Sequence, residues 1–408
     1  MSEHTSLRRE SFARPSLQAW RAVVDRDLKG APYEAKLLTK TPEGLTLDCL
    51  YTANGAASGA PSAVPTASGL GRPAGQAWRV VAEADCAPEE ANAQLLDELA
   101  RGADSIRLCL GRGLQSAADL ERACVGVDLA GRELVLAGPG EPLALAALAS
   151  AFAERRPDWA EGGLALDPCG SAAAGTLGAP LAASLGRLSA ALDLLGWGGP
   201  RRALEVGTGA FHAAGASEAD DLGFALASAL ELVRHSGRSL AELRPLLGFS
   251  LQLPSDLFLA IAKLRALRAL WARVEEVCGV EPAPIFVHAQ SAWRELSVRD
   301  PWVNVLRGTA TGFAAAVGGA NSLAIAPWDA CLATQTEGAR RVARNTHTIL
   351  REESHLHRVA DPGAGSYYLE ELTAGLAREA WGVFQAVEGQ GGMAQALTSG
   401  WIAARLAP

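Results

Sequence analysis

Lysine is nearly missing from this chain of 408 residues. The lysines are Lys29, Lys36, Lys40 and Lys263, and every other basic residue is an arginine. Past residue 40, an enzyme that forms a Schiff base with its substrate would therefore have to use Lys263. This scarcity nearly excludes the lysine-dependent aldolases.

Other features are missing as well. No apolar run approaches the roughly 20 residues that a membrane span requires, and the N-terminal MSEHTSLRRE has no apolar signal-peptide core. The seven cysteines are scattered singly without a C-x-x-C pair, and an odd number argues against a disulfide framework. A net charge of -8 argues against a nucleic-acid-binding surface. These absences predict a cytoplasmic protein that binds neither membranes nor nucleic acids.

Residues 1–77 differ from the rest of the chain. Apolar residues recur at helical spacing over residues 17–28, after which Lys29-Gly30 ends the helix. A turn and a short strand are expected within residues 41–51, and residues 53–76 are rich in Gly, Ala, Ser and Pro. This predicts a helix, a short strand and an extended arm, which together are too small to form a core. The segment should dock on the main domain or on a partner.

Residues 78–408 alternate between short apolar runs and longer helical patterns. The runs are almost continuously apolar, which is typical of parallel strands buried on both faces. Eight such units, spaced about 25–40 residues apart, favour an α/β fold of the (β/α)8 TIM-barrel type with a last helix over 372–388, and a doubly wound open sheet is the alternative. The eight runs are residues 78–83, 105–110, 133–138, 163–167, 203–207, 246–251, 285–289 and 322–327. The clearest helical patterns are residues 88–101, 142–155, 216–234, 255–278, 302–316 and 336–352.

Chemistry in such a barrel takes place at the carboxyl ends of the strands. The titratable residues expected there are His212, His288, Asp167 and Asp329. His288 and Gln290 lie two positions apart, so their side chains share one strand face. This pair is either functional or a polar plug in the mouth of the barrel.

Three further motifs predict no site. The H-x-H at 355–357 lacks the spacing of a metal-binding motif, so no metal site is expected. The G-x-G at 207–209 has no G-x-G-x-x-G around it, which argues against a dinucleotide site. The Gly pair at 318–319 precedes the last strand and should end a helix, not cradle a phosphate.

Long stretches that cover nearly the whole chain carry a family resemblance. They include WRAVVDRDLKG, AGASEADDLGFALASALELVR, AIAKLRALRALWARV and DPWVNVLRGTATGFAAAVGGANSLAIAPWD. These stretches resemble the methylmalonyl-CoA mutase family, the adenosylcobalamin-dependent acyl-CoA isomerases. The resemblance implies a (β/α)8 barrel, in agreement with the eight runs, and CoA threads this barrel in active members.

One departure from the family concerns the cofactor. Members that hold cobalamin themselves carry a C-terminal flavodoxin-like domain with a D-x-H-x-x-G motif, whose histidine ligates cobalt. None of the seven histidines here lies in such a motif. The resemblance therefore implies that this chain alone binds no cofactor and that a partner subunit holds adenosylcobalamin.

A second departure concerns positions that contact substrate in the family. Leu114 of the Arg112-Gly113-Leu114 run stands where active members have a tyrosine after the second strand. Leu246 falls near the place of an arginine that contacts the acyl-CoA. His288 and Gln290, in contrast, match the family's H-x-Q.

The family's Tyr-His pair after the fifth strand is also changed. An ungapped alignment places Gly209 and Ala210 there, whereas a two-residue gap would place Phe211 and His212 there. Loss of one general acid typically costs about 10²–10⁴-fold in rate, and several groups are missing together. We therefore expect no catalytic residue in this chain, and His212 would join the H-x-Q pair only if some activity remained.

This pattern resembles the small, non-catalytic subunit of heterodimeric bacterial mutases. The resemblance implies that the chain stabilises a large catalytic subunit, that residues 1–77 wrap this partner, and that the complex interconverts methylmalonyl-CoA and succinyl-CoA. Two alternatives stay open: the acyl-CoA barrel of a split mutase whose cobalamin protein is separate, and a degenerate CoA-binding module. A barrel axis plugged by large side chains would favour the non-catalytic subunit, and an open axial channel beside His288 would contradict it.

Overall fold

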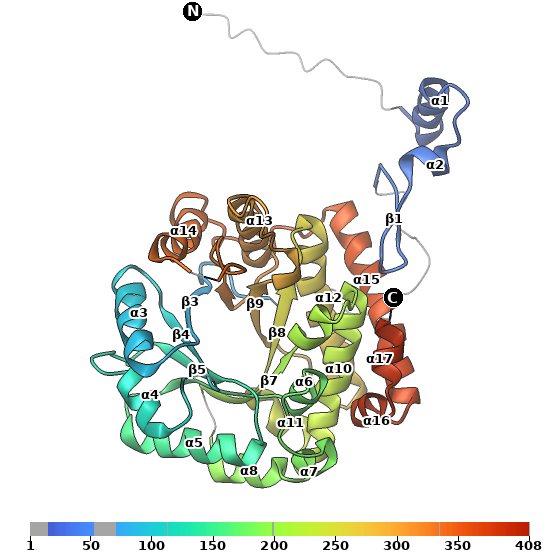
Figure 1. Cartoon of the computed structure of the whole chain (residues 1–408). Coiled ribbons are helices and arrows are strands. Elements are labelled where there is room, and N and C mark those ends of the chain that lie inside the picture. Colours follow the sequence, from blue (N-terminus) through green and yellow to red (C-terminus); the bar gives the residue numbers. More distant parts are fainter. Residues whose placement is uncertain (1–14, 53–70, 112, 198–199, 334, 408) are drawn as a thin grey trace, which may run out of the picture.

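Eight parallel strands close into a barrel at the centre of the molecule (Figure 1). The computed structural model describes residues 15–52, 71–111, 113–197, 200–333 and 335–407. The last strand pairs with both the first and the seventh, which closes the barrel. The predicted (β/α)8 barrel is thus confirmed, and the open-sheet alternative is wrong. The strands are β3 (Arg79–Ala84), β4 (Ser105–Cys109), β5 (Glu133–Ala137), β6 (Glu161–Leu166), β7 (Arg201–Gly207), β8 (Leu247–Leu253), β9 (Phe286–Ser291) and β10 (Ser322–Ala324).

Helices surround the barrel between successive strands (Figure 1). All six of the clearest helical patterns are confirmed, and none of the helices among the described residues is long and apolar enough to cross a membrane. The longer helices are α3 (Pro88–Ala100), α4 (Ala117–Ala123), α5 (Pro142–Arg155), α8 (Leu188–Leu195), α10 (Glu218–His235), α12 (Leu257–Val277), α13 (Val303–Val317) and α14 (Glu337–Thr348), which continues as a π-helical turn (Ile349–Glu353). The shorter ones are α6 (Pro168–Ala173), α7 (Leu181–Gly186), α9 (Gly209–Ala213), α11 (Leu240–Leu243) and the 3₁₀ turns Arg244–Leu246 and Trp293–Glu295.

Three helices follow the barrel: α15 (Tyr367–Gly389), α16 (Met393–Thr398) and α17 (Trp401–Leu406). Helix α15 packs along α10 and α12. It begins at Tyr367, not at residue 372 as predicted, because the Ser366 hydroxyl accepts a hydrogen bond from the Leu369 amide and caps the helix.

The main core lies between the outer face of the barrel and the helices. Alternate strand residues, such as Ile106, Leu108, Leu134 and Leu136, are fully buried there. The intervening residues of each strand therefore point into the barrel lumen.

Two adjacent glycines shape one side of the barrel. Gly162 and Gly163 on β6 both have positive φ, and a Cβ at either position would collide with the backbone of a neighbouring strand. The register between β6 and β7 shifts just after them. Only glycine permits this conformation and this close approach, so the irregularity is built into the sequence.

The N-terminal segment forms an arm that projects from the barrel (Figure 1). It consists of α1 (Leu17–Asp27), α2 (Tyr33–Leu37) and a hairpin of β1 (Thr39–Lys40) and β2 (Thr46–Leu47). The hairpin docks on the main domain, where Leu45 faces Gly375 of α15 and Tyr51 contacts Tyr368. Helix α1 buries none of its residues. Most of the predicted Gly-rich stretch, residues 53–70, lies outside the described residues.

Candidate functional site

The barrel lumen carries charged side chains where many barrels carry apolar layers. Arg107 on β4 donates to Glu205 on β7 at 2.7 Å. Arg79 on β3 donates to Glu161 on β6 at 2.6 Å. Two strands separate the members of each pair in the barrel order, so both ion pairs reach across the lumen.

A third ion pair lies in the same lumen. Arg202 on β7 pairs with Glu133 on β5, whose carboxylate also accepts a hydrogen bond from Ser105 at 3.1 Å. The Arg202 guanidinium packs over the Phe286 ring, 3.4 Å from its centroid. These large side chains occupy the lumen at the depth of the strands.

Both members of the Arg107–Glu205 pair are charged near neutral pH. Burial by itself would raise the pKa of Glu205, but the neighbouring Arg107 outweighs it and holds that pKa below its ordinary value. The Glu205 side chain is 3% exposed and that of Arg107 is 12% exposed. The axis of the barrel is therefore closed by a paired, ionised plug.

His288 and Gln290 share the inner face of β9, as predicted, although they lie within the strand and not after its end. His288 is buried, and its Nδ1 is 2.9 Å from the Ser322 hydroxyl. Burial, together with the charge of Arg107, lowers the pKa of His288 to about 3. The imidazole is thus neutral near neutral pH and acts as part of the polar plug.

The positions predicted to have lost catalytic residues lie in three different places. Leu114 is fully buried in the core after β4, and Arg112 lies outside the described residues. Gly209 and Ala210 begin α9 at the carboxyl end of β7. Leu246 is buried in the 3₁₀ turn before β8, at the opposite end of the barrel. None of these four side chains carries a group that can donate or accept a proton.

His212 lies behind the mouth of the barrel in a buried ionic cluster. Its Nδ1 is 2.8 Å from the Asp221 carboxylate on α10. The Lys263 ammonium on α12 donates to Asp221 at 2.6 Å and to Glu218 at 2.5 Å. Arg294 donates to Glu218 at 3.3 Å and to the His212 carbonyl at 2.9 Å. The cluster ties α9, α10, α12 and the loop after β9 to one another.

Lys263 is the one lysine past residue 40, and it is fully buried. Burial works against its charged form, but Asp221 and Glu218 outweigh burial and raise the pKa of Lys263 above its ordinary value. A Schiff base needs a neutral amine, so this geometry does not support one. Within the described residues, His212, Glu218 and Asp221 are the single group placed to hold a metal ion, and the ammonium lies between their carboxylates.

The two acidic candidates at the strand ends have structural partners. Asp167 accepts backbone hydrogen bonds from Gly170 at 2.8 Å and from Gly207 at 2.9 Å. Its burial raises its pKa to about 6. Asp329 is fully buried and accepts from the Thr336 amide and hydroxyl at 2.7 and 2.8 Å. Both carboxylates fasten loops at the mouth of the barrel.

The remaining motifs have structural roles. His355 is exposed with a φ of 54°, and the carbonyl of His357 accepts a hydrogen bond from the Gly75 amide. Gly318 caps the end of α13 and Gly319 follows with positive φ, so the prediction that this pair ends a helix is confirmed.

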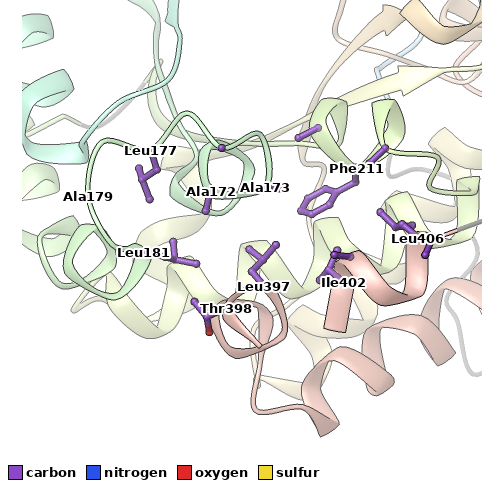
Figure 2. A pocket seen from close by; sticks show the side chains of 15 residues that line it. Ala172, Ala173, Leu177, Ala179, Leu181, Phe211, Leu397, Thr398, Ile402 and Leu406 are labelled. Carbon is purple, nitrogen blue, oxygen red and sulfur yellow. The ribbon is translucent and has the colours of Figure 1, made fainter. Parts of the chain in front are cut away.

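A cavity of about 580 Å³ lies outside the barrel. Figure 2 shows that mostly apolar side chains from α6, α7 and the loop between them, and from α9, α16 and α17, surround it. Ala210 and Phe211 lie on one wall, and none of the lining residues is titratable. The cavity therefore contains no ionisable acid or base among its described lining residues, and Thr398 contributes a hydroxyl.

Sequence reasoning missed the charged lumen and the partners of His212. A signal was present, because Arg107 and Glu205 interrupt otherwise apolar strand runs. Charged residues at alternate positions of barrel strands must lie in the lumen. Glu218 and Asp221 were harder to recognise as partners of His212. Both lie in the first turn of α10, where acidic residues are common because they stabilise the N-terminus of a helix.

Comparison with known proteins places these features in a family. The family model described as methylmalonyl-CoA mutase matches residues 110–407. The methylmalonyl-CoA mutase small subunit of Streptomyces virginiae is 40% identical over 96% of this chain and 66% of its own length. That of Porphyromonas gingivalis is 30% identical over 94% of this chain and 65% of its own length.

A probable methylmalonyl-CoA mutase small subunit of Mycobacterium tuberculosis (strain H37Rv) is 43% identical over 48% of this chain and 33% of its own length. The chain thus spans at most about two thirds of the length of these relatives.

Proposed function

The chain belongs to the methylmalonyl-CoA mutase family, and from this premise we propose that it is the non-catalytic small subunit of an adenosylcobalamin-dependent methylmalonyl-CoA mutase. In this role it stabilises a large catalytic subunit, and the complex interconverts methylmalonyl-CoA and succinyl-CoA. The relatives named above are called small subunits of this enzyme, which supports the proposal.

The plugged lumen is the observation that carries the proposal. Active members of the family thread CoA along the barrel axis. Here the Arg107–Glu205 pair and two further ion pairs bridge the lumen along that path. Opening the path would separate buried charges, and breaking a buried ion pair by removing one partner costs about 3–5 kcal/mol. A bound ligand would have to supply free energy of this order for each of the two buried pairs it displaced, and less for Arg79–Glu161, whose side chains are 36% and 34% exposed.

The changed positions lie at both ends of the same axis. Gly209 and Ala210 lie at the mouth of the barrel, and Leu246 lies at the other end. A ligand threaded through the barrel would therefore find neither a hydroxyl nor an imidazole at the former and no cation at the latter. This arrangement supports a barrel that has lost substrate contacts at both ends.

The described histidines do not fit the role of a cobalt ligand at the mouth. His212 and His288 are each 2% exposed, and each engages a side chain through Nδ1. The Nε2 atom of each ring has no hydrogen-bond partner, but it is buried in the interior. We therefore assign adenosylcobalamin to the partner subunit and derive no step from it in this chain.

The arm supports an association with a partner. Leu17 and Val23 on α1 are 43% and 45% exposed, and α1 buries no residue on its own barrel. An amphipathic helix held away from its own domain offers an apolar face to another chain. We propose that residues 1–77 contact the large subunit and that the complex is cytoplasmic, in keeping with seven free cysteines.

The test combines CoA binding with turnover. Calorimetric titration of the isolated chain with CoA and with methylmalonyl-CoA should show no binding. Co-expression with the large subunit of the same organism should yield a stoichiometric complex with mutase activity. Gln290→Ala in this chain should leave kcat and KM of that complex unchanged, because the substrate occupies the partner's barrel.

Other results would select the alternatives. CoA binding without turnover would identify a degenerate CoA-binding module. Turnover by this chain with only a separate cobalamin protein would identify a split acyl-CoA mutase, and Gln290→Ala should then reduce kcat.

A further inference from the structure

We propose that a cavity near the amino-terminal end of the barrel is a binding site for a small oxyanion of the phosphate class. Arg72, Arg265 and Arg268 line this cavity. Its volume of about 220 Å³ is below the roughly 300–1,000 Å³ of sites for drug-sized ligands, so it suits a free ion better than a nucleotide. The site is separate from the lumen, because none of its described lining residues lies on a barrel strand.

Segments that are distant in the sequence surround the cavity. They are residues 71–73 before β3, helix α12, the end of α13, Pro284 before β9 and residues 360–361 before α15. Of the lining residues, Pro73, Pro284 and Ala360 are exposed, so the cavity opens to solvent. An ion can therefore reach the arginines from outside.

Two of the three arginines are buried without a counter-ion. Arg72 and Arg268 are each 3% exposed. In the part of the chain that the structure describes, no carboxylate lies within ion-pair distance of either guanidinium. Asp361 attracts Arg268 only from farther away, and it is already paired with Arg265 at 3.2 Å. Buried charges in proteins are normally paired, so both arginines are exceptions.

Backbone carbonyls satisfy these guanidiniums only in part. Arg72 and Arg268 donate to four carbonyls at the end of α13 and just after it. These carbonyls belong to Ala316, Gly318, Gly319 and Ala320, at 2.5–3.2 Å. The C-terminus of a helix carries about half a negative charge, which cannot balance two positive ones. In addition, the Nε of Arg268 is buried and has no hydrogen-bond partner. An acceptor in the cavity that Arg268 lines would complete its hydrogen bonding.

Another buried arginine shows what a counter-ion does in this protein. The Glu205 carboxylate outweighs burial and raises the pKa of Arg107 above its ordinary value. Around the cavity the direction is reversed. Burial, together with the charge of Arg72, lowers the pKa of Arg268 to about 10, and burial also lowers the pKa of Arg72. An anion in the cavity would do for Arg268 what Glu205 does for Arg107.

The charges around the cavity leave a positive excess. Arg265 is paired with both Asp361 and Glu370, and the Glu370 side chain is 46% exposed. Three arginines thus face two carboxylates. A tetrahedral oxyanion presents oxygens in several directions, which suits guanidiniums from different elements, whereas a carboxylate presents two oxygens in one plane. This favours phosphate over a small carboxylic acid.

Two pairs of variants separate the site from general effects of charge. Arg268→Met removes a guanidinium without a counter-ion. Arg344→Met removes one that is similarly buried, at 5% exposed, but is paired with Glu98 away from the cavity. Ala360→Glu adds a carboxylate at an exposed lining position, whereas Ala182→Glu adds one at an exposed position on α7.

The experiment titrates the full chain with sodium phosphate by calorimetry at pH 7.5, with sodium chloride keeping the ionic strength constant. Arg268→Met should weaken phosphate binding at least about 10-fold, because a hydrogen bond between charged groups is lost. Ala360→Glu should also weaken it, since the new carboxylate competes for the arginines. Arg344→Met and Ala182→Glu should bind like the wild type, and acetate should bind more weakly than phosphate.

Thermal unfolding supplies a second measurement. Phosphate should raise the Tm of the wild type but not that of Arg268→Met, because a ligand stabilises only the folded state that binds it. The same scans identify a variant that fails to fold. If Arg268→Met fails, Ala360→Glu carries the test, since it removes no existing contact of the arginines.

Each contrary result has a distinct meaning. Absence of phosphate binding by the wild type would overturn the site, and so would equal weakening by Ala360→Glu and Ala182→Glu. Adenosine monophosphate is titrated in parallel. If it binds as tightly as phosphate and Arg268→Met abolishes this binding, the free ion is the wrong choice and the phosphate belongs to a nucleotide. None of these results bears on the proposed role as a small subunit, which association with the large subunit tests.

Discussion

Replacing Lys263 by methionine would remove the buried ammonium between two carboxylates. Methionine keeps an unbranched chain of similar length, so the change mainly deletes charge. The carboxylates of Glu218 and Asp221, which are 3% and 0% exposed, would then lie in the interior without the lysine that neutralises them. Removing one partner of a buried ion pair costs about 3–5 kcal/mol. Because a domain is stable by only about 5–15 kcal/mol, a loss of this size is readily measured.

Arg101→Met is the matched control. Arg101 and Asp97 are 2.5 Å apart, as close as Lys263 and Glu218, but their side chains are 47% and 33% exposed. Surface ion pairs contribute about 0–1 kcal/mol, so this variant should unfold almost like the wild type. Urea unfolding at pH 7.5, followed by circular dichroism, gives both free energies.

The deficit of Lys263→Met should also depend on pH. Burial already raises the pKa of Glu218 in the folded protein, and loss of the ammonium raises it further. A group with a raised folded pKa contributes stability at low pH that is lost as pH rises through that pKa. The difference between variant and wild type should therefore be smaller at pH 5.5 than at pH 8. A cost below about 1 kcal/mol, equal to that of Arg101→Met, would refute the reasoning.

Two further predictions concern the barrel and its packing. Burial lowers the pKa of His288 and of His347 to about 3, so each histidine resists protonation in the folded protein. Lowering the pH from 7.5 to 5 should therefore reduce the free energy of unfolding by about 2 kcal/mol for each of them. In urea titrations, His288→Gln should remove the part of this acid destabilisation that comes from His288. A Cβ at Gly223 on α10 would collide with Val383 of α15, so Gly223→Ala should lower the free energy of unfolding by about 1–3 kcal/mol. The control is Gly186→Ala, because a Cβ at Gly186 would meet no atom within 4 Å. In thermal unfolding, this control should be as stable as the wild type or more stable.

The fold followed from local patterns. Ile106, Leu108, Leu134 and Leu136 lie in short apolar runs, and each run became a strand with these residues on its outer face. Periodicity and length suffice here because each strand must bury its outer face against a helix. The start of α15 was missed by five residues, since the cap at Ser366 lies in a stretch dominated by glycine and proline.

The candidate site was predicted only in part. His288 and Gln290 share an inner face because side chains alternate along a strand, and this is readable from spacing alone. The orientation of the His212 side chain could not be predicted from the sequence, because it depends on which charged residues α10 and α12 bring beside it. The choice between a functional pair and a polar plug also depended on Arg107 and Ser322, which lie on other strands.

The sequence by itself determined the eight strand–helix units and the family, because these depend on residue type and local order. It also predicted the loss of acid–base groups at Leu114, Gly209 and Ala210. Only the tertiary structure decided that the axis is closed. Arg107 and Glu205 are 98 positions apart in the chain, and closure of the sheet is what brings them across one lumen. Local pattern cannot specify such a contact, because it reports which face a side chain takes but not which distant side chain it meets there.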